Sequence, residues 1–145
     1  MPLDVIAARA GVGAGTVYRQ FPSKEALFAA VQEEAVRDLI VCAEGLLTAD
    51  DPASGFDTFL ELLADQARIK RDLPEAITVP TELGARMREV LAALLERAQE
   101  AGAVRTDLTA GDLVILLKAL VQIARDADPN QLSRLRAVMF AGLRR

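Results

Sequence analysis

Apolar residues recur along most of the chain at intervals of three and four, the spacing that places them on one face of a helix. No segment shows the alternation of apolar and polar residues that is typical of an exposed strand. Between positions 24 and 47 the predicted apolar stripe consists of Phe28, Val31, Ala35, Leu39, Cys42 and Leu46. The pattern therefore predicts an all-α fold.

Residues that start and stop helices divide this pattern into segments. Ser23, Thr81 and Thr109 are suitable N-caps, and Asp51 and Asp128 each precede a proline, which favours the first turn of a helix. Glycines close two of the segments, as expected for helix C-termini. The expected helices span residues 3–10, 14–21, 24–47, 52–71, 81–101, 109–125 and 128–143.

The first two expected helices are short, are separated by a glycine-containing turn, and are followed by Pro22-Ser23 and a long helix. This layout is typical of a helix-turn-helix DNA-binding motif attached to a larger helical domain. We therefore divide the chain into a DNA-binding module, residues 1–23, and a larger helical domain, residues 24–145. Residues 24–47 form the helix that links them.

Several residues around the second short helix have the chemistry of DNA contacts. Thr16 and Tyr18 can donate hydroxyl hydrogen bonds to phosphates, and Arg19 and Gln20 can reach base edges. Small residues before them would let the backbone approach the duplex. The expected DNA-contacting residues are Gly13, Ala14, Gly15, Thr16, Tyr18, Arg19, Gln20 and Lys24.

Composition and charge narrow the possible functions. The 145 residues carry a net charge of −4, but residues 1–24 hold three basic residues and one acidic residue, a local +2. A weakly basic N-terminal segment followed by an acidic remainder of the chain is compatible with local DNA contact. With no His and a single Cys, Cys42, expected to be a small buried side chain, we expect no enzyme, no metal site and no cofactor. We also expect no signal peptide, no membrane span and a cytoplasmic location.

The segment Leu113–Ala124 is apolar on nearly every side, so it must be covered all round. A second copy of the chain is the simplest cover, and we expect a two-fold dimer in which the last two helices form a four-helix bundle with their mates. The alternative is the central core helix of a monomer. The expected interface residues are Leu113, Leu116, Leu117, Leu120, Leu135, Val138 and Met139.

The run of residues 11–31, GVGAGTVYRQFPSKEALFAAV, resembles the DNA-binding signature of the TetR family of bacterial transcriptional regulators. The resemblance implies a homodimer that binds a palindromic double-stranded DNA operator and releases it when a small molecule enters the larger domain. By position, Thr16, Tyr18 and Lys24 match the phosphate-contacting residues of the family. Gly13, Ala14, Gly15, Arg19 and Gln20 match its variable, base-facing positions.

The family module has three helices, and the first of them would precede Met1, so the resemblance implies that residues 1–23 are a partial DNA-binding module and residues 24–145 a ligand-binding and dimerisation domain. We favour a truncated chain over a natural variant, and in either case we expect weak operator binding by residues 1–145. The alternative functions are a helical dimer that binds small molecules or proteins without touching DNA and, more remotely, an enzyme.

The resemblance also implies an effector cavity in the larger domain. Side chains of three expected helices can line an apolar cavity, and Arg86, Gln66 or Thr78 can provide a polar anchor. For each residue, an ordinary core position is an equal alternative. We expect a small, mostly apolar effector, and a lining formed by Phe56, Phe59, Leu63, Gln66, Met87 and Leu91.

Overall fold

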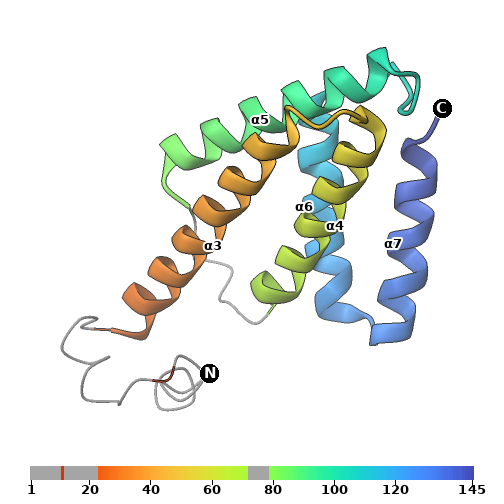
Figure 1. The fold of residues 1–145 in the computed structure, drawn as a ribbon. Helices are drawn as coiled ribbons and strands as arrows, with labels where there is room; N and C mark the ends of the chain where they lie inside the picture. The colour runs from red at the N-terminus through yellow and green to blue at the C-terminus, as the bar shows by residue number, and fades with distance from the viewer. Residues whose placement is uncertain (1–10, 12–22, 72–78) are drawn as a thin grey trace.

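Helices α3 to α7 form the described part of the chain, and the only β pairing in it is an isolated bridge between Val104 and Arg144 (Figure 1). The computed structural model describes residues 11, 23–71 and 79–145. The expected helices at 3–10 and 14–21 lie outside these residues. The described helices are α3 (Lys24–Leu46), α4 (Pro52–Arg71), α5 (Thr81–Glu100), α6 (Ala110–Asp126) and α7 (Pro129–Leu143).

Helix α3 begins where Ser23 predicts it to begin. The Ser23 hydroxyl oxygen accepts a hydrogen bond of 3.1 Å from the backbone N–H of Ala26, which satisfies one of the free donors of the first turn. The apolar stripe predicted for this helix is partly wrong, because Val31 and Cys42 are exposed. Apolar residues occur on more than one side of α3, so their spacing alone could not select the buried face. The buried residues are Leu27, Phe28, Gln32, Val36, Leu39, Ile40 and Ala43.

The ends of the other helices follow the predicted caps with one exception. Thr109 and Asp128 each form a capping box, with Asp112 and Gln131 as their partners. The Asp51 carboxylate accepts a hydrogen bond from the N–H of Ala53 at the start of α4. The cap predicted for Thr81 is wrong, because α5 begins at Thr81 itself and no side chain caps it.

We expect Thr109→Ala to lower the free energy of unfolding by about 1 kcal/mol, because the substitution removes both hydrogen bonds of the Thr109 hydroxyl with Asp112. Urea unfolding followed by circular dichroism would measure the change. Thr106 provides the control: it is exposed and has no hydrogen bond from its side chain in the described part of the chain. A loss from Thr106→Ala as large as that from Thr109→Ala would contradict the assigned cap.

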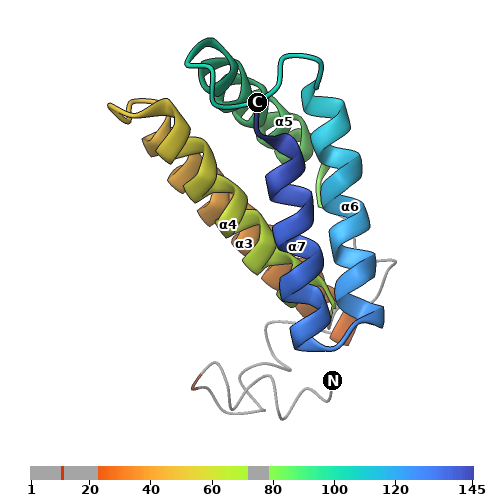
Figure 2. The same cartoon turned by 90° about the vertical axis from the view of Figure 1, so that its right-hand side faces the viewer.

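The helices pack around a main core in which α4 and α5 are central. Helix α3 packs against α4 and α5, and α6 packs against α4, α5 and α7 (Figure 2). Phe56 and Phe59 of α4 are among the most buried side chains, together with Leu91 and Leu94 of α5. A second, smaller cluster joins Ala64 and Ala67 of α4 to α6 and α7.

The turn after α5 is fixed to the end of α7. Gly102 has a φ of +78°, a left-handed conformation in which glycine avoids the strain of a side chain. Beyond it, the N–H of Arg105 donates to the carbonyl oxygen of Leu143 over 3.0 Å, and the N–H of Arg145 donates to Ala103 over 3.4 Å. These bonds hold α7 beside the α5–α6 connection.

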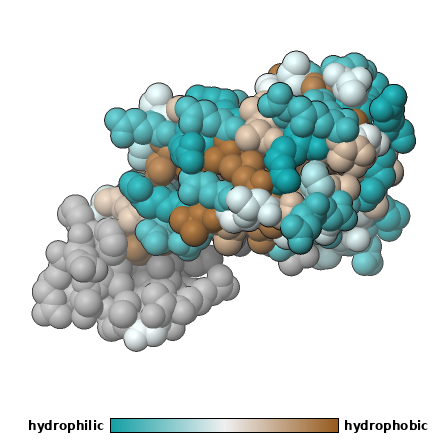
Figure 3. All heavy atoms as spheres, turned by 45° about the horizontal axis from the view of Figure 1, so that its top comes forward, coloured by the Kyte–Doolittle hydropathy of each residue, from teal (hydrophilic) through white to brown (hydrophobic). Residues whose placement is uncertain are grey.

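The surface seen in Figure 3 is mostly hydrophilic, with hydrophobic side chains gathered near the middle of the described part. The exposed large apolar residues are Val31, Val41, Ile115, Leu135 and Val138. None of the described helices has the length and apolar character needed to cross a membrane.

Candidate functional site: a cavity bordered by four helices

The residues predicted to contact DNA fall mainly on segments that the structure does not describe. Gly13, Ala14, Gly15, Thr16, Tyr18, Arg19 and Gln20 all lie outside the described residues. Lys24 is described: it is exposed in the first turn of α3, directly after the N-cap Ser23. Its ammonium group is therefore accessible to a partner at the end of α3 that adjoins the predicted DNA-binding module.

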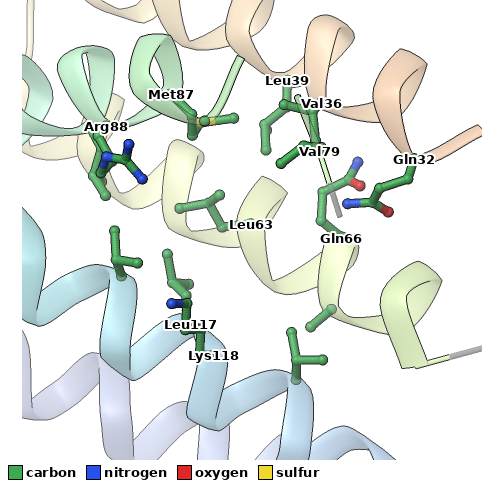
Figure 4. A pocket seen from close by; sticks show the side chains of 15 residues that line it. Gln32, Val36, Leu39, Leu63, Gln66, Val79, Met87, Arg88, Leu117 and Lys118 are labelled. Carbon is green, nitrogen blue, oxygen red and sulfur yellow. The ribbon is translucent and has the colours of Figure 1, made fainter. Parts of the chain in front are cut away.

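A cavity of about 200 Å³ lies among α3, α4, α5 and α6 (Figure 4). Its wall is mainly apolar, and each of the four helices contributes at least three residues to it. The lining residues are Gln32, Val36, Leu39, Leu63, Gln66, Ala67, Val79, Gly84, Met87, Arg88, Leu91, Val114, Leu117, Lys118 and Val121.

Four of the six residues predicted for a pocket line this cavity: Leu63, Gln66, Met87 and Leu91. The prediction was wrong for Phe56 and Phe59, which do not line it. Both are buried in the main core, because this part of α4 is covered by neighbouring helices. Of the suggested anchors, Gln66 lines the cavity and Thr78 lies outside the described residues.

The linking helix, α3, was expected to border the cavity, but none of its lining residues was predicted, and the contribution of α6 was not predicted at all. Gln32, Val36 and Leu39 of α3 line the cavity, and so do Val114, Leu117, Lys118 and Val121 of α6. One signal for Gln32 was present in the sequence, since it stands four residues from both Phe28 and Val36, on the same helical face. A polar residue inside an apolar stripe is a reason to look for a polar site.

The polar atoms of the cavity are concentrated at two amides. Gln32 is only 3% exposed, and its side chain lies next to that of Gln66 in Figure 4. The Oε1 atoms of both amides are buried and have no hydrogen-bond partner among the described residues.

Arg86, the third suggested anchor, does not line the cavity but connects α5 to α3. Its Nη2 and Nε atoms lie 2.7 and 3.0 Å from Glu44 Oε1, and it also pairs with Glu89. The hydrogen bond with Glu44, supported by the bond with Glu89, raises the pKa of Arg86. This exposed ion pair lies near the C-terminal end of α3.

Arg97 fixes the same end of α3 through hydrogen bonds to backbone oxygens. Its guanidinium donates to the carbonyl oxygens of Leu46, at 3.3 Å, of Leu47, and of Ala49, at 3.0 Å. These carbonyls lie at the end of the helix and in the turn that follows, where backbone acceptors lack intrahelical donors. The C-terminal end of α3 is thereby held against α5.

The residues predicted for a dimer interface divide into three groups by their burial in the single chain. Leu113 and Leu120 are buried within the chain itself, so neither is available to a second copy. Leu116, Leu117 and Met139 are partly buried against the chain's own core or cavity. The reason is that α4, α5 and α7 already cover much of the apolar surface of α6.

The third group, Leu135 and Val138 of α7, is exposed in the single chain, and so is Ile115 of the neighbouring helix α6. A groove between α6 and α7 includes Leu135, together with Ala119 and Ile123 of α6. The α6/α7 face, defined by Ile115, Ala119, Ile123, Leu135 and Val138, is the apolar surface that the fold leaves uncovered on these helices.

Comparison with known proteins gives two family matches that together span most of the chain. Residues 2–31 match the model for bacterial regulatory proteins of the tetR family. Residues 51–145 match the model for the C-terminal domain of SbtR-like transcriptional regulators. A comparison with curated proteins finds no match.

Two solved structures are similar over almost the whole length of the chain. A TetR transcription regulatory protein from Mycobacterium vanbaalenii is 34% identical, with a TM-score of 0.69 over 100% of this chain and 84% of that one. A TetR transcriptional regulator from Streptomyces coelicolor is 30% identical, with a TM-score of 0.72 over 96% of this chain and 85% of that one.

Proposed function

Because the chain belongs to the TetR family of DNA-binding transcriptional regulators, we propose that it is a homodimeric repressor that leaves its operator when a small molecule fills the cavity. The observation that carries this proposal is the position of α3. Its first turns belong to the segment that matches the DNA-binding family model, and its middle, at Gln32, Val36 and Leu39, lines the cavity. One helix therefore joins the two functions.

The two ends of α3 are held differently. Arg97 and the Arg86–Glu44 pair fix the C-terminal end, whereas the cavity borders the middle of the helix. A ligand that presses on Val36 and Leu39 would tilt α3 about its fixed end and move the segment before Lys24. The separation of the two DNA-binding segments in a dimer would change, which would weaken simultaneous binding to two half-sites.

The α6/α7 face supports the homodimer part of the proposal. Its exposed apolar side chains would be covered by the same face of a second copy in an isologous, two-fold arrangement. Two helices from each copy would then form a four-helix bundle.

For DNA contact we propose the residues that match the family signature. Thr16, Tyr18 and Lys24 would bind phosphates, whereas Arg19 and Gln20 would read base edges beside the small residues Gly13, Ala14 and Gly15. The effector would be a small, mostly apolar molecule, because the cavity wall is mainly apolar.

Selection of bound duplexes from a random DNA pool tests the proposal, because the pool contains every candidate operator. We expect an enriched palindrome with half-sites about one helical turn apart. The selection is made at low salt, where phosphate contacts are strongest and the weak binding expected of residues 1–145 is detectable. If no sequence is enriched under these conditions, the repressor proposal fails and a helical binding module that does not use DNA becomes the better interpretation.

Two variants separate phosphate contact from base reading in that experiment. We expect Lys24→Ala to weaken binding to all sequences and to reduce the slope of log affinity against log salt by about 1. We expect Arg19→Ala instead to change which bases are enriched. Titration of the selected duplex at several salt concentrations measures the first effect, and a repeated selection measures the second. An unchanged salt slope for Lys24→Ala would contradict a phosphate contact.

A further inference from the structure

The side-chain amides of Gln32 and Gln66 lie next to each other. The described residues provide no hydrogen-bond donor for the Oε1 atom of either amide. A buried acceptor without a donor destabilises the folded protein, and most buried polar atoms in native proteins are paired. Gln32 is 3% exposed and faces the cavity beside Gln66 (Figure 4), so a molecule inside the cavity can supply the missing donor. This end of the cavity therefore favours a hydroxyl or N–H group.

The remaining polar side chains of the lining are cationic. Arg88 of α5 and Lys118 of α6 are exposed, and neither forms an ion pair or hydrogen bond with the residues described. Figure 4 shows both of them away from the two amides. No acidic side chain is among the described lining residues. The charge around the solvent-exposed part of the cavity thus favours an anionic group over a cationic one.

The size of the cavity limits the body of the ligand. An apolar cavity of about 150 Å³ can hold a benzene ring, and this cavity measures about 200 Å³. Leu63, Met87 and Leu91 give it apolar walls. The space suits one ring, or a branched chain of similar size, with small polar groups attached.

We propose that the cavity selects a small amphiphilic acid. Its apolar body would lie against Leu63 and Met87, its hydrogen-bond donor between Gln32 and Gln66, and its anionic group near Arg88 and Lys118. This inference rests on the proposed function, because it names the class of effector that the same cavity would take.

Three related probes test the class by titration calorimetry on the full chain: 4-hydroxyphenylacetate, 4-methoxyphenylacetate and tyramine. The methoxy acid lacks the donor, and we expect it to bind about tenfold more weakly than the hydroxy acid, because the buried amide oxygens remain unpaired. Tyramine keeps the hydroxyl but is a cation, and we expect it to bind more weakly than the hydroxy acid. That second difference should shrink as the salt concentration rises, since salt screens exposed charges.

Two variants assign these preferences to residues. Gln32→Met should reduce the difference between the hydroxy and methoxy acids and leave the preference for acid over amine. Lys118→Met should reduce the preference for acid over amine and leave the difference between the hydroxy and methoxy acids. Equal binding of the hydroxy and methoxy acids by the unmodified protein, or failure of all three probes to bind, would overturn the inference.

The stability of the ligand-free protein gives a second measurement. We expect Gln32→Met to raise the melting temperature, because an apolar side chain of similar length replaces an amide with an unpaired buried oxygen. A lower melting temperature would show that the amide stabilises the fold and would overturn its assignment to a ligand. Because these measurements use no DNA, the inference can fail while the selected operator is still bound and released by another molecule.

Discussion

Val138→Glu is expected to convert the dimer to a monomer and to weaken binding of the selected operator at least about 100-fold. Val138 is 68% exposed in the chain, so the substitution leaves the core of the single chain unchanged. In a two-fold interface the new carboxylate appears twice, and moving both charges from water into an apolar contact costs several kcal/mol. A monomer has one DNA-binding module and loses the gain from binding both half-sites at once.

Sedimentation velocity at micromolar concentration measures the first effect, and operator titration measures the second. Val41 on α3 is a matched control because it is also a valine that is 68% exposed, and α3 and α7 lie on opposite sides of the molecule in Figure 1. Val41→Glu should leave the dimer intact. A Val138→Glu protein that still sediments as a dimer would rule out the α6/α7 face as the interface.

Phe59→Ala is expected to lower the free energy of unfolding by about 3–5 kcal/mol, the usual cost of removing a large side chain from a closed core. Phe59 has 0% exposure and lies in the main core, where α4 meets α5 and α6. For a chain of this size the melting temperature should fall by about 10 °C.

Urea unfolding at a fixed protein concentration measures this loss, because the stability of a dimer depends on concentration. The neighbouring Thr58 provides the control. It is exposed, and its hydroxyl only donates to the carbonyl of Ser54 in its own helix, so Thr58→Ala should change the free energy of unfolding by less than about 0.5 kcal/mol. A loss below about 1 kcal/mol for Phe59→Ala would be inconsistent with the closed packing around this ring.

The helix limits and the fold class were predictable because they depend on local chemistry. Four of the five described helices begin directly after their predicted caps, and Thr109 and Asp128 form the capping interactions that their sequences indicate. Thr81 was misassigned because a good capping residue can equally well occupy the first turn, and here Pro80 precedes it. The family resemblance of residues 11–31 was confirmed by the match over residues 2–31.

The candidate site was only partly predictable from the sequence. The spacing of apolar residues can show which side of a helix is buried, but not whether a residue on that side lines a cavity or packs in the core. Phe59 and Leu63 lie on the same side of α4, one turn apart, yet the first is enclosed by neighbouring helices and the second faces the cavity. The difference depends on how α3, α5 and α6 are placed around α4. For the same reason the apolar pattern of α6 predicts Leu113 and Leu120 as interface residues, although the chain's own helices bury them.

The uninterrupted length of α3 has a consequence for how little movement regulation would require. Its 23 residues make a rigid arm of about 34 Å, held at one end by Arg97. A rotation of about 5° would then carry its far end through about 3 Å, and opposite rotations in two copies would add. An effector no larger than a single ring could therefore misalign the two DNA-binding segments relative to a double helix, while the core of the domain keeps its packing.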